Sequence, residues 1–158
     1  MMGIDPVTLI AALIVASTPI LLAAIGELVV EKAGVLNLGV EGMMITGAIC
    51  GFAIAVDSGS PTLGFIAAAG GGAALSLVFA FLTQYLLSNQ VATGLALTLF
   101  GLGLSALIGV SYSGISPPVT PSLDIPGLSD MPVLGPILFS HDAIVYLSVA
   151  LVAAVWAT

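Results

Sequence analysis

Five apolar stretches, separated by short segments rich in polar residues, proline or glycine, make up most of this sequence. A helix needs about 20 apolar residues to cross the hydrocarbon core of a bilayer, with a range of about 17 to 25. Four stretches meet or approach this length, and the fifth is short. They are Val7 to Ile25, Val40 to Val56, Thr62 to Leu87, Val91 to Val110 and Ala143 to Thr158. The pattern predicts an all-α, polytopic transmembrane helix bundle with about five membrane helices.

The composition supports a chain that is solvated by lipid. Hydrophobic residues make up 59% of the sequence and charged residues only 6%, whereas a soluble domain is about a quarter charged. The formal net charge of −7 reflects the near absence of basic residues, because the chain has a single Lys or Arg. We therefore expect a lipid bilayer as partner and no nucleic acid, which would require a basic surface.

The sequence offers no apparatus for catalysis. It contains one His, one Cys and scattered carboxylates, which give no metal-ligand spacing. It has no GxxxxGK[ST] phosphate loop. His141 and Asp142 precede an apolar stretch, where helix capping is the favoured role. We predict that the chain is not an enzyme, that it has no cofactor or metal site, and that any energy source is another polypeptide or an ion gradient.

The charged residues concentrate in Gly26 to Gly42, which contains Glu27, Glu31, Glu41 and Lys32. Ionisable groups near or within a bilayer are costly and are kept mainly where they pair, face a cavity or contact a partner. Lys32 is the only basic residue, and basic residues favour the cytoplasmic side. The segment is therefore predicted to be cytoplasmic, with the N-terminus extracytoplasmic.

Five alternating crossings then give a consistent orientation. The turn Asp57 to Pro61 is expected outside, Ser88 to Gln90 inside, and the proline-rich segment Ser111 to Asp142 outside. Every aspartate falls on the extracytoplasmic side in this arrangement: Asp5, Asp57, Asp124, Asp130 and Asp142.

The polar residues of Gly34 to Gly42 are the first candidates for a solute path. Three glycines bracket Asn37 and Glu41, a pattern that suits an irregular backbone. Irregular backbone at membrane depth is tolerated where protein or a water-filled cavity covers it, and transporters build binding sites from such segments. The alternative is a plain cytoplasmic loop with Glu41 near a helix N-terminus, favoured there by the helix dipole. Both interpretations stay open.

A second polar segment, Ser88 to Gly94, supplies the other candidates. Asn89 and Gln90 lie at a helix junction, where capping and turning are common roles. Thr93 lies one turn into the next helix, where it could bind a ligand or its own backbone. The predicted path residues are thus Asn37, Glu41, Asn89, Gln90 and Thr93.

The segment 111–142 differs from the rest of the chain. It contains six of the nine prolines, at a density that prevents regular helix. We expect an ordered extramembrane loop, on the extracytoplasmic side, inside one transmembrane domain that covers residues 1–158. Small residues within the helices predict tight helix packing. The glycines concerned are Gly70, Gly71, Gly72, Gly94, Gly101, Gly103 and Gly109.

Two motifs carry a resemblance to a known family. The run ILLAAIGELVVEKAGVLNLGVEGMMITGA, from Ile20 to Ala48, resembles inner-membrane permease subunits of ABC importers for simple sugars, nucleosides and branched-chain amino acids. The run NQVATGLALTLFGLGLSALIG, from Asn89 to Gly109, is similar to a second stretch of that family. The motif GVLNLGVEG is typical of the nucleoside branch.

The resemblance implies a multi-pass protein of the cell membrane that forms part of a larger permease fold. It implies ABC ATPase subunits, a second permease subunit and an extracytoplasmic solute-binding protein as partners. Such permeases are about twice this length, so the chain resembles an N-terminal half. The expected function is translocation of nucleosides or related sugar-containing solutes. The alternatives are a permease for simple sugars or branched-chain amino acids, a non-transporting membrane fragment, and a small gradient-driven carrier.

Overall fold

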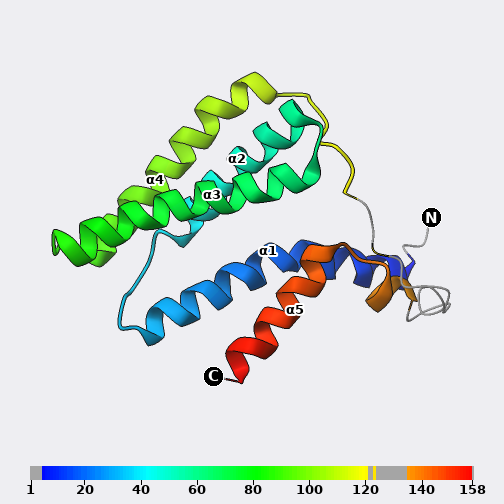
Figure 1. The fold of residues 1–158 in the computed structure, drawn as a ribbon, viewed down its shortest axis with the longest axis horizontal. Coiled ribbons are helices and arrows are strands. Elements are labelled where there is room, and N and C mark those ends of the chain that lie inside the picture. The colour runs from blue at the N-terminus through cyan, green and yellow to red at the C-terminus, as the bar shows by residue number, and fades with distance from the viewer. Residues whose placement is uncertain (1–4, 121–122, 124–134, 158) are drawn as a thin grey trace. The chain divides into compact units, whose positions relative to one another are not determined.

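The computed structural model describes residues 5–120, 123 and 135–157. Long helices dominate this part of the chain (Figure 1). Their bounds are α1 Pro6–Lys32, α2 Val40–Ser58, α3 Pro61–Ala80, α4 Gln90–Gly109 and α5 Ala143–Trp156. Short π-helical turns η1 and η3 occupy Phe81–Tyr85 and Gly135–Phe139, and a 3₁₀ turn η2 occupies Val110–Tyr112.

The all-α class and the membrane-type helices are confirmed. Among the described residues, four helical stretches are long and apolar enough to cross a bilayer: Pro6–Lys32, Val40–Ser58, Pro61–Tyr85 and Gln90–Tyr112. The fifth predicted helix forms as α5, but it has 14 residues and is a shorter apolar helix. The prediction of about five membrane helices therefore corresponds to four full-length candidates and one short helix.

Two predicted boundaries were wrong. The first helix does not end at Ile25, the end of the predicted apolar stretch, but continues to Lys32, so the charged residues Glu27, Glu31 and Lys32 lie on its last turns. Glu, Leu, Val and Lys in this stretch all tolerate helical geometry, and no glycine or proline follows Gly26 until Gly34. The third stretch is also not one regular helix, because η1 replaces its last turn.

Residues 121–122 and 124–134 of the predicted proline-rich loop lie outside the described residues, and they include Pro121, Pro126, Pro132, Asp124 and Asp130. At its beginning, the backbone leaves α4 through η2 and becomes irregular after Gly114. At its end, η3 precedes α5, and Asp142 caps α5 by accepting a hydrogen bond from the Val145 N–H at 3.2 Å. The capping role predicted for Asp142 is confirmed.

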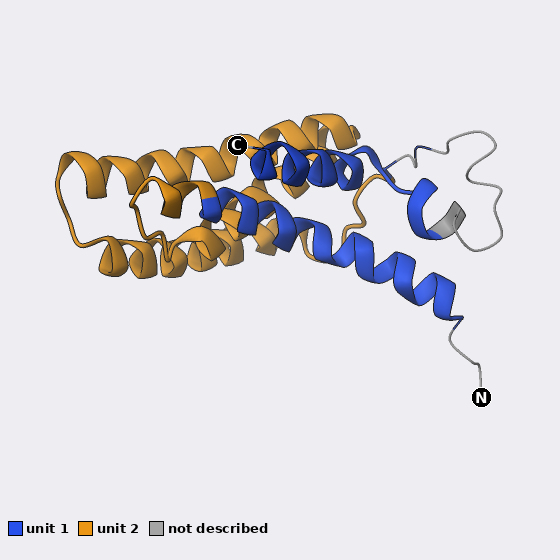
Figure 2. Ribbon diagram, turned by 90° about the horizontal axis from the view of Figure 1, so that it is seen from below, with its two compact units in different colours: residues 1–28, 120–158 blue, residues 29–119 orange. Residues whose placement is uncertain are grey.

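The chain divides into two compact units, residues 1–28 with 120–158 and residues 29–119 (Figure 2). The second unit contains the last residues of α1, all of α2, α3 and α4, and both polar segments singled out in the sequence. The candidate site can therefore be described within this unit alone.

Local signals set the helix ends in the second unit. Gly34 has a φ of +82°, its N–H donates to the Glu31 carbonyl at 2.9 Å, and the Val35 N–H donates to the Val30 carbonyl at 3.2 Å. This pair of bonds is a Schellman motif, which ends α1 and needs the left-handed conformation that glycine adopts freely. At the next junction, Asn89 caps α4 by accepting from the Ala92 N–H at 3.0 Å.

Helix α2 packs against both α3 and α4, and glycines bring the backbones together on each side. A Cβ added at Gly42 would lie 2.5 Å from the Leu97 carbonyl oxygen of α4, and one at Gly101 would lie 2.5 Å from the Gly42 carbonyl oxygen. Toward α3, a Cβ at Gly51 would lie 2.8 Å from the Gly64 carbonyl oxygen. In lipid, close packing of this kind drives helix association.

The tight packing predicted for the small residues is confirmed at some glycines and absent at others. Gly71, Gly94 and Gly101 each lie where an added Cβ would come within 3.0 Å of a neighbouring atom. An added Cβ at Gly70 or Gly103 would meet nothing within 4 Å. Only one face of each glycine-rich stretch therefore serves helix packing.

The buried apolar cluster of this unit lies beside the junction between α1 and α2. It combines Met43 of α2, Leu75 and Phe79 of α3, and Leu97 of α4, and Val35 from the connecting segment packs against it. At the other end of α2, the Tyr112 hydroxyl donates to the Asp57 carboxylate at 2.8 Å. Contacts at both ends thus connect α2 to its neighbours.

Candidate functional site

The structure brings together the two polar segments that the sequence analysis identified separately. The connection from α1 to α2, residues 33–39, lies against the first turns of α4. The Leu36 N–H donates to the Gln90 Oε1 at 2.8 Å, and the Thr98 hydroxyl donates to the Leu38 carbonyl oxygen at 3.1 Å. Side chains of α4 therefore provide hydrogen-bond partners for two backbone groups of the non-helical segment.

Backbone packing adds a third attachment between these two hydrogen bonds. A Cβ at Gly94 would lie 2.8 Å from the Gly39 nitrogen and 2.9 Å from the Leu38 nitrogen. Gln90 and Thr98 are eight residues apart, which corresponds to roughly 12 Å along a helix axis. The irregular segment thus runs beside the first two turns of a candidate membrane span.

Asn37 stabilises this irregular backbone from inside. Its side chain is 7% exposed, and its Oδ1 accepts a hydrogen bond from the Gly39 N–H at 3.0 Å. Its Nδ2 lies 3.5 Å from the Met43 sulfur, a weak acceptor. The amide therefore bridges the segment and the first turn of α2, which agrees with the irregular backbone expected around Gly34 to Gly42.

The remaining candidates occupy different positions. Glu41 is exposed in the first turn of α2, where the helix dipole favours a carboxylate. Asn89 acts as the N-cap of α4, the role favoured for it in the sequence. The Thr93 hydroxyl lies 2.9 Å from the Ser88 hydroxyl, which also donates to the Leu82 carbonyl at 2.7 Å. These contacts place Thr93 at the junction between η1 and α4.

Thr98 was not selected from the sequence. A threonine two turns into an apolar helix ordinarily bonds to its own helix backbone, and nothing in the local pattern indicates a partner 60 residues away. Gln90 was selected, but its partner was not predicted. Among the described residues, no three His, Cys, Asp or Glu side chains gather as metal ligands.

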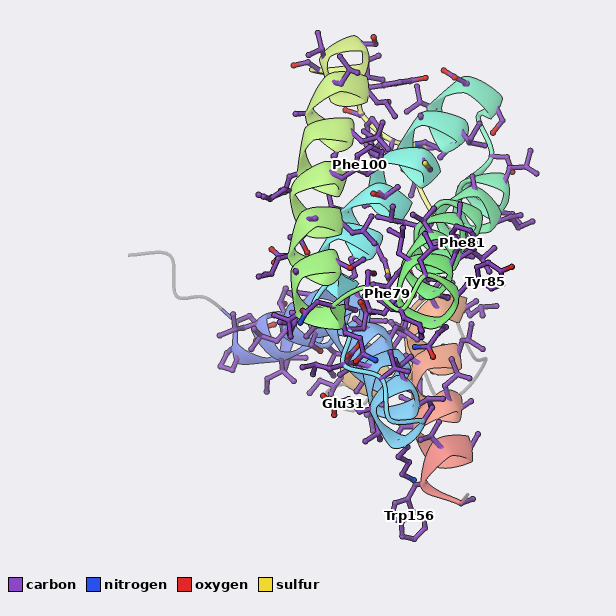
Figure 3. The ribbon with its side chains drawn as sticks, turned by 90° about the vertical axis from the view of Figure 1, so that its left-hand side faces the viewer. Glu31, Phe79, Phe81, Tyr85, Phe100 and Trp156 are labelled. Atoms are coloured by element: carbon purple, nitrogen blue, oxygen red, sulfur yellow. The ribbon has the colours of Figure 1, made fainter. Side chains whose placement is uncertain are left out.

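Aromatic side chains on the same unit serve mainly in packing. Phe79 is 4% exposed within the apolar cluster. Phe81 and Tyr85 of η1 stack with ring centroids 5.3 Å apart and are both exposed (Figure 3). Phe52 meets Tyr112 edge to face at 6.1 Å. Of these rings, Phe79 belongs to the buried apolar cluster beside the candidate site.

The arrangement places polar groups beside the buried apolar cluster of the bundle. The sequence decides the family: residues 9–158 match the family described as the permease component of the branched-chain amino acid transport system. The chain belongs to this permease family. The predicted resemblance is confirmed, and the permease family is one of transport components and not of enzymes.

Curated relatives of this permease chain are ABC transporter permeases. A candidate glucose ABC transporter permease of Haloferax volcanii is 42% identical over 152 residues, which cover 94% of this chain and 46% of that protein. A guanosine ABC transporter permease of Bacillus subtilis is 33% identical, over 84% of this chain and 45% of its own length. A nucleoside ABC transporter permease of Lactococcus lactis is 27% identical, over 86% of this chain and 46% of that protein.

The permease chain spans about half the length of the curated relatives it matches. No solved structure matches it significantly. Membership of this permease family agrees with the predicted multi-pass membrane helices.

Proposed function

We propose that this chain is a membrane-spanning component of an ATP-driven ABC importer that translocates nucleosides or related sugar-containing solutes. The carrying observation is the joining of the two polar segments: the non-helical backbone at Leu36 and Leu38 is held by Gln90 and Thr98 beside a candidate membrane span. Irregular backbone within a membrane is tolerated where protein covers it or where it lines a cavity, and transporters use such segments to bind solutes. The proposed partners are two ABC ATPase subunits, a second permease subunit and an extracytoplasmic solute-binding protein.

The names of the relatives support the proposed solute class. Two of them are named for guanosine or nucleosides, and the motif GVLNLGVEG supports the same class. The relative with 42% identity is named for glucose, which favours a simple sugar as the second candidate. Both solute types carry a sugar ring, so we propose that the path accepts a sugar and that an attached base decides between them.

Uptake by the assembled transporter tests the proposal. The chain is coexpressed with candidate ATPase and binding proteins, with and without a segment that supplies the remaining length of the relatives. Radiolabelled guanosine and glucose are then offered in separate assays. We expect ATP-dependent uptake of guanosine, with glucose uptake alone favouring the second candidate. If no candidate ATPase copurifies with the chain, even when the remaining segment and the binding proteins are coexpressed, the importer assignment is overturned.

The predicted orientation has its own test. In a background in which Cys50, the single cysteine, is replaced by alanine, single cysteines are introduced as Thr62→Cys at the start of α3 and Gln84→Cys in η1. Both positions are exposed, so reagent access depends on the side of the membrane. With Lys32 cytoplasmic, a membrane-impermeant maleimide is expected to label Thr62→Cys in intact cells and Gln84→Cys only after permeabilisation. The reverse pattern would invert the proposed topology.

Two glutamates provide a matched comparison for the proposed path. Glu41 follows the segment held by α4, whereas Glu31 lies in the last turn of α1 (Figure 3). Both side chains are exposed. Glu41→Ala in the complete permease is expected to reduce uptake by roughly tenfold, the size of one lost charge-assisted hydrogen bond. Glu31→Ala is expected to change uptake much less. The measurement is the initial uptake rate of each variant, corrected for the amount of permease in the membrane. Equal reductions of uptake in Glu41→Ala and Glu31→Ala would contradict a special role for Glu41.

A further inference from the structure

We propose that Gln90 and Thr98 are positioning residues that fasten the segment Leu36–Leu38 to α4. The segment and α4 then move as one body when the solute path changes from opening on one side of the membrane to opening on the other. This inference rests on the proposed transport function. It assigns Gln90 to holding the path backbone instead of contacting the solute, and it adds Thr98 to the residues that shape the path.

The first argument concerns hydrogen-bond satisfaction. Leu36 donates to the Gln90 Oε1 at 2.8 Å, and Leu38 accepts from the Thr98 hydroxyl at 3.1 Å. Both backbone groups belong to residues outside any helix, so no neighbouring turn supplies a partner. Where water is scarce, a backbone group without a partner costs several kcal/mol more than in solution. The side chains of α4 therefore supply the hydrogen-bond partners that this non-helical backbone lacks locally.

The second argument concerns rigidity. The two hydrogen bonds lie on either side of the close backbone contact between Gly39 and Gly94, over roughly 12 Å of α4. Asn37 bonds to Gly39 within the same segment, which restricts its conformation further. Three attachments along one helix face leave the segment little freedom to move independently of α4. Any displacement of α4 is then transmitted to the backbone that carries Asn37.

The test measures release of the segment in native membranes. Val35 is half-buried against the apolar cluster, so Val35→Cys, with Cys50→Ala, reports when the segment separates from the bundle. Ser76→Cys on α3 reports general loosening of the same unit. Its native hydroxyl bonds only to its own helix, at the Ala73 carbonyl, and its side chain is also half-buried.

Two pairs of variants separate the hydrogen bond from the presence of a side chain. Gln90→Leu removes the acceptor, whereas Gln90→Glu keeps an oxygen in its place. Thr98→Val removes the donor with little change in shape, whereas Thr98→Ser keeps a hydroxyl. We expect Gln90→Leu and Thr98→Val to raise maleimide labelling at position 35 by roughly tenfold, with little change at position 76. Gln90→Glu and Thr98→Ser are expected to label like the parent.

The outcomes decide the proposal. The attachment is overturned if the two variants of each pair are labelled equally at position 35. The pairs are Gln90→Leu with Gln90→Glu, and Thr98→Val with Thr98→Ser. A parallel rise at positions 35 and 76 would show general loosening and would overturn it as well. If Gln90→Leu does not reach the membrane, the Thr98 pair gives the same test.

Transport supplies the second readout. In the assembled permease, Gln90→Leu combined with Thr98→Val is expected to lower the uptake rate by at least about tenfold at unchanged expression. Normal uptake together with raised labelling at position 35 would contradict the role in transport. Absence of uptake by the unaltered permease would instead overturn the proposed function, whereas the labelling test of the attachment would stand by itself.

Discussion

Replacement of Gly42 by alanine is expected to separate α2 from α4 and to destabilise the helix bundle by about 1–3 kcal/mol. The added Cβ would lie 2.5 Å from the Leu97 carbonyl oxygen and 2.6 Å from the Thr98 Cα, distances that no rotamer change relieves because both atoms are backbone. The clash lies beside the Thr98 hydroxyl bond to Leu38, so it also strains the attachment of the candidate site. Heating of the detergent-solubilised chain, with the soluble fraction followed by gel filtration, measures the loss.

Gly103→Ala provides the matched control on α4. An added Cβ at Gly103 meets nothing within 4 Å, and alanine is a better helix former than glycine by about 1 kcal/mol. We expect Gly103→Ala to be neutral or slightly stabilising. The reciprocal change Gly101→Ala, whose Cβ would lie 2.5 Å from the Gly42 carbonyl oxygen, is expected to behave like Gly42→Ala. Equal thermal stability of Gly42→Ala and Gly103→Ala would contradict the packing described for α2 and α4.

Replacement of Asn37 by alanine is expected to destabilise the α1 to α2 connection by about 1–3 kcal/mol. The change leaves the buried Gly39 N–H without the Asn37 Oδ1, its partner at 3.0 Å, and it opens space beside Met43. Because Asn37 is 7% exposed, water cannot readily replace the lost amide. The same thermal assay, together with labelling of Val35→Cys, detects both the lower stability and the release of the segment.

Asn89→Ala is the control for Asn37→Ala. It removes a side chain of the same type, but Asn89 is exposed and caps α4. Loss of this cap lowers the free energy of unfolding by only about 1 kcal/mol, because water partly replaces the lost hydrogen bond. We expect a smaller decrease in thermal stability and no rise in labelling at position 35. If Asn89→Ala released the segment as strongly as Asn37→Ala, the bridging role of Asn37 would be wrong.

Much of the fold could be predicted because each membrane helix is encoded locally. An apolar run of sufficient length has few alternatives to a helix in lipid, since every backbone group needs an internal partner. The caps at Asn89 and Asp142 were recognisable because a capping residue also lies directly before the helix that it caps. The end of α1 was missed because charged residues suggested a boundary at Gly26, whereas the Schellman turn at Gly34 ends the helix.

The sequence predicted several residues of the candidate site, but it did not predict which of them contact one another. Asn37 and Gln90 stood out as polar residues at breaks between apolar stretches, but their solute-path role remains a prediction. Their hydrogen-bond partners depend on tertiary packing: Gln90 binds a backbone group 54 residues away, and Thr98 binds one 60 residues away. No local pattern encodes such pairs, so Thr98 passed for an ordinary helix residue.

The sequence by itself determined the lipid-solvated class, the helical stretches and the permease family, because length, hydropathy and motif are properties of contiguous residues. The tertiary structure alone decided which glycines meet, since Gly42 and Gly101 touch backbone whereas Gly103 does not. The tertiary structure also decided that the connection from α1 to α2 is hydrogen-bonded to the first turns of α4. The physical reason is that close helix packing fixes the distances between residues far apart in the chain, and short-range hydrogen bonds form only where packing brings the partners together.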